Sequence, residues 1–313
     1  MLEATVKKIL QARVYEAACE TPISSAPFLS RRFNNQILIK REDLQPVFSF
    51  KIRGAYNKMA QLTDEQKAKG VIAASAGNHA QGLAMAAKLM GVKAVIVMPR
   101  ITPDIKVQAV RARGAKVVLK GDAFAAAAEH AQELIKEHGY TYIPPFDDID
   151  VVAGQGTIGV EILRQHSGRL DAIFIPVGGG GLIAGVAAYV KYLRPDIKII
   201  GVEAEDSACL KAALEAGERV VLDQVGVFAE GVAVAQIGEV PFSLVRDLVD
   251  DVITVNTDEM CAAVKDIFED TRAVAETSGA LSLAGLKKYV QQTGAEGETL
   301  LCINSGANTN FDR

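Results

Sequence analysis

The sequence lacks tryptophan and has few other aromatic residues, with 7 tyrosines and 11 phenylalanines among 313 residues. Its interior must therefore be built mainly from aliphatic side chains. Such a composition suits helices packed on the faces of a buried parallel sheet. The length predicts one large or two moderate domains.

The chain is also poor in metal-binding and disulfide patterns. None of its cysteines, Cys19, Cys209, Cys261 and Cys302, belongs to a C-x-x-C pair, and its four histidines show no ligand-like spacing. We therefore expect a reduced, cytoplasmic protein without a structural metal.

Basic charge is not in excess, since 34 Lys and Arg face 38 Asp and Glu, a net charge of −4. This argues against nucleic acid or an anionic membrane as the main partner.

The N-terminal MLEATVKKIL has no signal-peptide pattern. Residues 172–190 are uncharged and nearly long enough to span a bilayer. Pro176 and four glycines interrupt them, which predicts a strand, a loop and a helix instead.

Strand and helix patterns alternate regularly between residues 70 and 145. Short apolar runs at 71–75, 93–99, 115–121 and 141–145 alternate with helical patterns at 78–91, 103–114 and 122–139, each of which ends in glycine. This alternation predicts about four strands of a parallel sheet.

A second alternating series begins near Asp150. Helices are expected at 151–168, 209–217, 258–270 and 278–290, strands at 172–177, 197–203 and 251–257, and a last strand in the segment 299–308. We expect an α/β fold with two parallel-sheet domains and a cleft between them. The predicted larger domain comprises 1–50 and 148–313, and the smaller comprises 51–147.

Four consecutive glycines lie between a predicted strand and a predicted helix, at 178–181. Glycine lets the backbone approach phosphate oxygens, and a helix N-terminus favours negative charge. Gly179, Gly181 and Ala184 also fit the dinucleotide pattern G-x-G-x-x-A, and Glu203 ends the next strand, where a ribose-binding acid would lie. A phosphate site, a NAD site and a plain tight turn all remain open at this point.

Lys51 lies at the start of a predicted helix in the segment SFKIRGAYNKMA. Its neighbours Phe50 and Ile52 could desolvate the amine, lower its pKa and free it for Schiff-base chemistry. The alternative is a solvated lysine in the first turn of a helix.

Two more polar turns follow predicted strands. SAGNHAQG (75–82) places Ser75, Gly77, Asn78 and His79 at a helix N-terminus, although Asn78 could simply cap that helix. CINSGAN (302–308) places Ser305 at the end of the last strand. Parallel sheets bind ligands at the carboxyl ends of their strands.

Glu276, in AETSGALS, precedes a predicted helix. Taken alone, it is interpreted as a residue near a helix cap.

Together, SFKIRGA, SAGNHAQG, GGGGL (178–182) and SGAN (305–308) resemble, in order and spacing, the fold-type II pyridoxal-phosphate enzymes of the threonine/serine dehydratase group. EAEDSACLKAAL (203–214) and FAEGVAV (228–234) further resemble biosynthetic threonine dehydratases. This resemblance implies a pyridoxal 5′-phosphate cofactor and deamination of L-threonine to 2-oxobutanoate and ammonia.

The resemblance also implies residue roles. Lys51 would be the catalytic lysine that bonds to the cofactor and takes the Cα proton. The implied cofactor-binding residues are Lys51, Phe50, Asn78, Gly178, Gly179, Gly180, Gly181, Leu182 and Ser305. The implied substrate-binding residues are Ser75, Ala76, Gly77 and His79.

Three departures from relatives lead to further expectations. Racemases of this group have a serine where this chain has Ala76, so we expect little racemisation. Some relatives bind a divalent cation through a Glu and an Asp six residues later, but Glu203 is followed at that spacing by Cys209, so we expect no metal site. The chain stops at SGANTNFDR, so we expect no regulatory domain and no inhibition by isoleucine.

Several functions remain open. A serine-preferring dehydratase would need a pocket that differs by about one methyl group, worth ~1–3 kcal/mol. A NAD-dependent oxidoreductase would leave Lys51 and Ser305 without a role, and a non-catalytic binding protein would need no lysine in the cleft. Relatives imply a homodimer or homotetramer.

Overall fold

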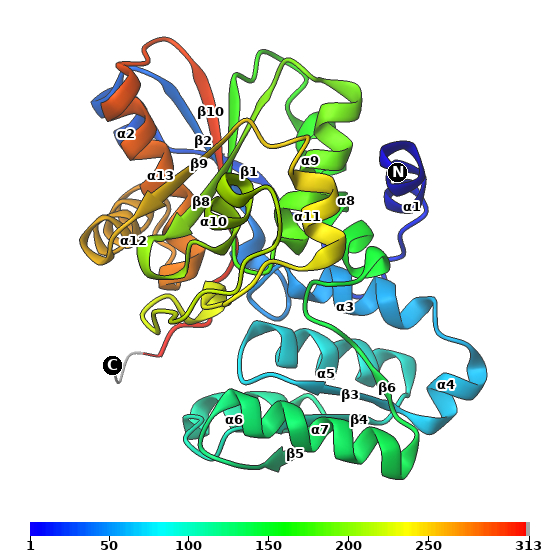
Figure 1. The fold of residues 1–313 in the computed structure, drawn as a ribbon. Coiled ribbons are helices and arrows are strands. Elements are labelled where there is room, and N and C mark those ends of the chain that lie inside the picture. Colours follow the sequence, from blue (N-terminus) through cyan, green and yellow to red (C-terminus); the bar gives the residue numbers. More distant parts are fainter. Residues whose placement is uncertain (311–313) are drawn as a thin grey trace.

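The computed structural model describes residues 1–310, which form two bodies, each built around a mainly parallel sheet (Figure 1). The larger sheet has the order β1-β2-β10-β7-β8-β9. Its strands are β1 (Ile23–Ser25), β2 (Gln36–Arg41), β7 (Ala172–Pro176), β8 (Lys198–Ala204), β9 (Asp251–Val255) and β10 (Thr299–Asn304). Only β1 runs antiparallel to its neighbour.

The helices around the larger sheet are α1 (Leu2–Leu10), α2 (Pro27–Phe33), α8 (Ile149–Gln165), α9 (Gly181–Leu193), α10 (Cys209–Ala216), α11 (Glu239–Val245), α12 (Thr257–Thr271) and α13 (Thr277–Thr293). Short 3-10 turns are η1 (Glu42–Leu44), η2 (Glu205–Ser207) and η3 (Glu230–Val232).

The smaller sheet has the order β5-β4-β3-β6, with all pairs parallel. Its strands are β3 (Val71–Ala74), β4 (Ala94–Met98), β5 (Lys116–Leu119) and β6 (Thr141–Tyr142). The accompanying helices are α3 (Lys51–Ala60), α4 (Asp64–Lys69), α5 (Asn78–Met90), α6 (Asp104–Ala112) and α7 (Phe124–His138). Figure 1 shows α3 at the junction of the two bodies.

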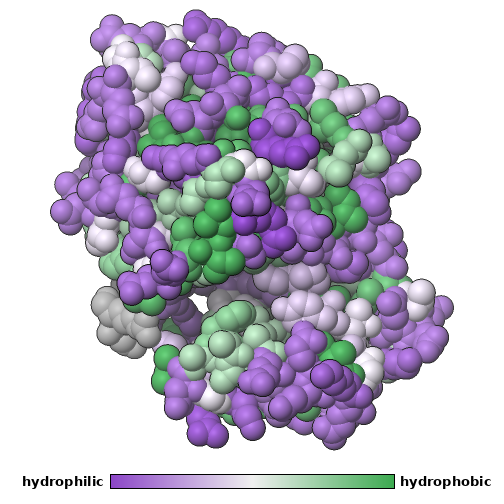
Figure 2. Space-filling view, viewed as in Figure 1, coloured by the Kyte–Doolittle hydropathy of each residue, from purple (hydrophilic) through white to green (hydrophobic). Residues whose placement is uncertain are grey.

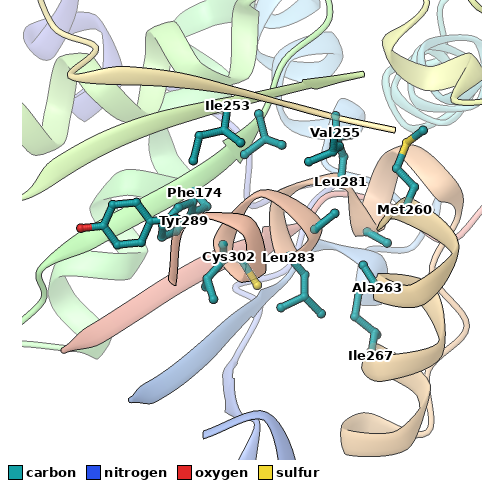
Figure 3. Packing of buried hydrophobic residues seen from close by; sticks show 14 of the residues in the cluster. Phe174, Ile253, Val255, Met260, Ala263, Ile267, Leu281, Leu283, Tyr289 and Cys302 are labelled. Carbon is teal, nitrogen blue, oxygen red and sulfur yellow. The ribbon is translucent and has the colours of Figure 1, made fainter. Parts of the chain in front are cut away.

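Both faces of the larger sheet are buried, as expected when helices cover each side. Phe174 of β7 packs on one face with α12 and α13, and its ring meets Tyr289 edge to face at 5.3 Å (Figure 3). Its neighbours Ile173 and Ile175 point to the opposite face and pack with α8 and α9. The period of two along the strand thus feeds two separate apolar layers.

The smaller sheet follows the same pattern. Val95 and Val97 of β4 face α7, whereas Ile96 and Met98 lie in the cluster that includes α3, α5 and α6. Small alanines on α7, Ala127 and Ala131, let that helix approach the sheet closely.

The structure confirms the α/β fold, including the four strands expected between residues 70 and 145. No strand was expected in the first 50 residues, yet β2 lies inside the larger sheet, beside β10. The domain boundaries at 50, 51, 147 and 148 remain a prediction. Among residues 1–310, no helix combines the length and apolarity that a membrane crossing needs.

Candidate active site

Lys51 is the first residue of α3, and the apolar face expected for this helix, formed by Ile52, Ala55, Tyr56 and Met59, is buried. The Lys51 ammonium donates to the Pro145 carbonyl at 2.9 Å and lies 5.2 Å from the centre of the Phe50 ring. Burial lowers the pKa of Lys51 from 10.5 to about 8, and only the Glu276 charge opposes this shift. The interpretation of Lys51 as a solvated lysine is therefore wrong.

The four glycines connect β7 to α9, which begins at Gly181. Gly180 has a φ of +88°, in the left-handed region that glycine tolerates. A Cβ on Gly179 would lie 2.2 Å from the Phe146 ring, so no other residue fits there without displacing that ring. The first bond of the helix joins the Ala184 N–H to the Gly180 carbonyl at 3.0 Å. The preceding amides are free to bind an anion, as at other helix starts.

The turn after β3 leads into α5, whose N-cap is Gly77 and whose first residue is Asn78. The alternative that Asn78 caps this helix is wrong. Its amide donates to Glu276 Oε1 at 2.6 Å, and its carbonyl oxygen accepts from Asn308 at 2.7 Å. Asn78 therefore crosses from the smaller body to segments beside the larger sheet.

His79 is buried, and its Nε2 lies 2.8 Å from the Ile143 carbonyl. Burial, together with the Lys51 charge, lowers the pKa of His79 to about 3. The ring is therefore neutral near pH 7, and it must carry its proton on Nε2 to donate this bond.

Ser305 follows β10, and its carbonyl accepts from the Phe50 N–H at 3.2 Å. This bond ties the end of the last strand to the residue before Lys51. The Ser305 hydroxyl makes one long contact, 3.4 Å to the Ser278 carbonyl. Such a weak bond leaves the hydroxyl able to turn toward a ligand.

Glu276 occupies the N-cap position of α13, but its side chain makes no capping bond. It instead accepts from Asn78, and burial raises its pKa to about 7. Its expected place near a helix cap is confirmed, but its side chain contacts Asn78 and lines the pocket instead of capping the helix. Its place in the sequence alone gave no sign of the contact with Asn78, 198 residues away.

One pocket collects most of these groups, and Figure 2 shows the surface hollowed between the two bodies. Its lining residues are Phe50, Lys51, Asn78, Pro176, Gly178, Gly179, Gly180, Gly181, Leu182, Gly231, Val232, Glu276, Ser278 and Ser305. Every residue expected to bind the cofactor is among them.

The residues expected to bind substrate, Ser75, Ala76, Gly77 and His79, adjoin Asn78 in the chain but do not line the pocket. Four lining residues had no expected role in binding, namely Pro176, Gly231, Val232 and Ser278. Of these, Gly231 and Val232 belong to the segment FAEGVAV, whose resemblance to relatives was the available signal.

Glu203, the acid that a NAD site would require, is fully buried. Its two carboxylate oxygens accept from the backbone N–H groups of Leu210 and Lys211 at 2.7 and 2.9 Å. The carboxylate thus holds the first turn of α10 and is closed to a ribose, so the dinucleotide interpretation is wrong. Burial raises the pKa of Glu203 to about 7. Within residues 1–310, no group of three or more His, Cys, Asp or Glu could hold a metal ion.

Comparison with known proteins gives concordant matches. The family model described as pyridoxal-phosphate dependent enzyme matches residues 14–306. The biosynthetic L-threonine dehydratase IlvA of Burkholderia multivorans is 57% identical over 311 residues, covering 98% of this chain and 61% of the relative. The corresponding enzyme of Salmonella typhimurium is 59% identical over 306 residues and is covered to 59%. The chain thus spans about 60% of the length of these curated relatives.

Solved structures agree. The processed form of threonine deaminase isoform 2 from Solanum lycopersicum has a TM-score of 0.97 and 49% identity, covering 99% of this chain and 90% of that one. Maize serine racemase has a TM-score of 0.93 and 33% identity, covering 99% of this chain and 94% of that one. With the match to the family model over residues 14–306, these likenesses show that the chain belongs to the family of pyridoxal-phosphate-dependent enzymes.

Proposed function

We propose that this chain converts L-threonine to 2-oxobutanoate and ammonia, the first step of isoleucine biosynthesis. An α,β-elimination would expel the Cα proton and the β-hydroxyl as water, and hydrolysis of the aminoacrylate product would release ammonia. The observation that carries the proposal is the pocket that joins Lys51, with its pKa of about 8, to the glycine loop. The relatives named threonine dehydratase and threonine deaminase support this choice of substrate.

The residues of the pocket fit pyridoxal 5′-phosphate. The loop at 178–181 lines the pocket with backbone amides that precede the first hydrogen bond of α9, and Lys51 supplies an amine that is partly neutral near pH 7. Bound there, the cofactor would supply a carbonyl for the amines of Lys51 and substrate and a ring that accepts electrons from Cα.

The protein would supply position and proton transfer. The amides of 178–181 and Leu182 would bind the phosphate, Phe50 would pack against the ring, and Asn78 and Ser305 would bond to its 3′-oxygen and nitrogen. A serine hydroxyl is a poor acid, so Ser305 would donate a hydrogen bond without protonating the ring nitrogen. The N-terminal turn of α5, with Ser75, Ala76, Gly77 and His79, would hold the substrate carboxylate.

Lys51 would then remove the Cα proton. A base works best when its pKa lies near the working pH, and a pKa of about 8 meets that condition. The charge of Glu276, which also lines the pocket, offsets only part of the effect of burial on Lys51, so the amine would stay reactive. The methyl group of Ala76 offers no proton to the opposite face, so racemisation should be slow despite the likeness to serine racemase.

A preference for L-serine is the second candidate, and discrimination of one methyl group is worth only ~1–3 kcal/mol. The decisive experiment records the visible spectrum, reduces the protein with borohydride and maps the label. A yellow protein labelled at Lys51 that forms keto acid faster from threonine than from serine is the expected result. A colourless protein, or a label on another residue, would overturn the proposal.

We further propose a homodimer or homotetramer in the cytoplasm. The four free cysteines, of which Cys19 and Cys261 are exposed, favour a reducing compartment. Light scattering of the purified protein measures the assembly, and a monomer would contradict it.

A further inference from the structure

Helix α8 packs against both α3 and α9 at backbone distance. A Cβ on Gly154 of α8 would lie 2.6 Å from the Arg53 carbonyl of α3. On the other side, a Cβ on Gly185 of α9 would lie 2.4 Å from the Val152 carbonyl of α8. Lys51 begins α3, and the glycine loop runs into α9. The seating of α3 on α8 therefore sets where the Lys51 amine lies relative to that loop.

Arg53 lies in the first turn of α3. Every nitrogen of its guanidinium donates a hydrogen bond that helps to hold α3 on α8. Nε and Nη2 each donate at 2.8 Å to the carboxylate of Glu42, on η1. Nη1 and Nη2 donate to the two oxygens of Glu161, on α8, at 2.6 and 3.0 Å. Nη1 also donates to Thr157 of α8 at 3.1 Å, and Nη2 to the Cys19 carbonyl at 3.2 Å. The planar fork of arginine matches two carboxylates in this way, which a lysine does not.

The cluster is closed to water and balanced in charge. Arg53, Glu42, Glu161 and Lys40 are all fully buried, and the Lys40 ammonium lies 2.6 Å from Glu161. Burial alone would raise the pKa of Glu161, but the charges of Arg53 and Lys40 hold it below its usual value. The Glu161 carboxylate therefore stays ionised and keeps the geometry of Arg53 fixed.

We infer that Arg53 is a positioning residue for Lys51: clamped by Glu42 and Glu161, it fixes α3 on α8 so that the amine stays within reach of a cofactor held by the glycine loop. The inference rests on the proposed function for its substrate. It concerns the lysine–cofactor bond, which can be followed without any substrate. Arg53 itself does not line the pocket.

The test compares Arg53→Lys with the milder Thr157→Val, which keeps the shape of the side chain but removes one acceptor of Arg53. Apoprotein is mixed with pyridoxal phosphate. Three quantities are then measured separately: the affinity of the protein for the cofactor, the rate at which the covalent bond to Lys51 forms, and the extent of borohydride trapping. The kcat and KM for threonine follow. A displacement of about 1 Å can cost ~10²-fold in rate. We expect Arg53→Lys to slow both the covalent step and kcat by ~10–100-fold, with cofactor affinity and KM little changed, and Thr157→Val to do so to a smaller extent.

Lys287→Met is the matched control, because Lys287 pairs with Asp266 in another buried ion pair, between α13 and α12. It should lower thermal stability without slowing the covalent step. The inference would be overturned if the covalent step were equally fast in Arg53→Lys, Thr157→Val and Lys287→Met. If Arg53→Lys does not fold, the slower covalent step in Thr157→Val decides alone. Wild-type protein without a label at Lys51 would instead overturn the proposed function.

Discussion

Lys51 and Arg53 lie two residues apart on α3, the first half-buried and the second fully buried, but their surroundings act on them in opposite directions. Burial lowers the pKa of Lys51 to about 8, because the charge of Glu276 offsets only part of this effect. Burial also disfavours the charge of Arg53, but Glu42 and Glu161 reverse this and raise its pKa. The unpaired cation becomes a reactive amine, and the paired one becomes a fixed support.

The acids repeat this contrast. Glu276, in the pocket, has a pKa raised to about 7 by burial, whereas Glu161, in the buried cluster, keeps a lowered pKa through Arg53 and Lys40. Basic and acidic side chains thus serve either for chemistry or for support, depending on whether an ion-pair partner stabilises the charge.

Replacing Lys51 with alanine tests the reactive side of the comparison. We expect kcat to fall by ~10³-fold or more, because the base and the covalent bond to the cofactor are both lost. Stability should hold or rise, since an unpaired buried amine is removed. The measurements are keto-acid formation and urea unfolding of the apoprotein. A Lys51→Ala protein that retains activity, or one that unfolds as readily as a cluster variant, would remove the distinction between the two sites.

Replacing Glu161 with glutamine tests the supporting side. Arg53 and Lys40 would then share one carboxylate, and breaking a buried ion pair on one side costs about 3–5 kcal/mol. Urea unfolding should show this loss in the free energy of unfolding. The control is Glu20→Gln, which breaks an exposed pair with Arg164 of the same helix and should change stability little. If the free energy of unfolding fell by a similar amount in both variants, the buried cluster would stabilise the fold no more than an exposed ion pair does.

A pH series sharpens the difference between Lys51 and its neighbours. The covalent bond to the cofactor requires the neutral amine, so its rate should rise about tenfold per pH unit and level off above about pH 8. Glu276→Gln should shift this midpoint to lower pH, because the Glu276 charge raises the pKa of Lys51. The Glu20→Gln protein serves as the unshifted reference. A midpoint near 10.5, the pKa of a free lysine, would show that burial does not govern Lys51.

The sequence predicted the reactive site better than the supporting one. Lys51, the glycines and Ser305 lie in short motifs whose order and spacing resemble a family, so local patterns were enough to propose them. The partners of Arg53 are Glu42 and Glu161, the second of them 108 residues away. No periodicity links these positions, and only the packing of α3 on α8 brings them together. The contact between Glu276 and Asn78 was missed for the same reason, since Asn78 begins α5 in the smaller body, 198 residues away.

The fold, too, was predicted from the sequence only in part. Alternating apolar runs and glycine stops predicted the strands and helices from residue 70 onward, because parallel strands buried on both faces read as continuous apolar segments. β2 was missed, although it pairs with β10 along its whole length. Its sequence, QILIKR, ends in two charged residues that are buried nonetheless, because Lys40 joins the cluster around Arg53 and Arg41 pairs with Asp43. Charged residues in a sequence usually indicate exposure to solvent, but this inference fails where a carboxylate partner is buried beside them.

The smallest effect expected is on the pH dependence of stability, where the two acids should act in opposite windows. The pKa of Glu276 is raised from 4.5 to about 7, so the stability that its protonated form contributes is present below about pH 4.5 and is lost as pH rises to about 7. The pKa of Glu161 is lowered, so its contribution is present above about pH 4.5 and is lost as pH falls below it. Glu276→Gln should therefore remove ~1–3 kcal/mol of the decline in stability of the apoprotein between pH 4.5 and 7. Buried Glu203, whose pKa is also raised to about 7, leaves a residual decline in both proteins, so the difference between wild type and variant is the quantity to measure. Parallel unfolding curves for the two proteins across this range would show that Glu276 has a charged partner after all, and it would then belong with Glu161.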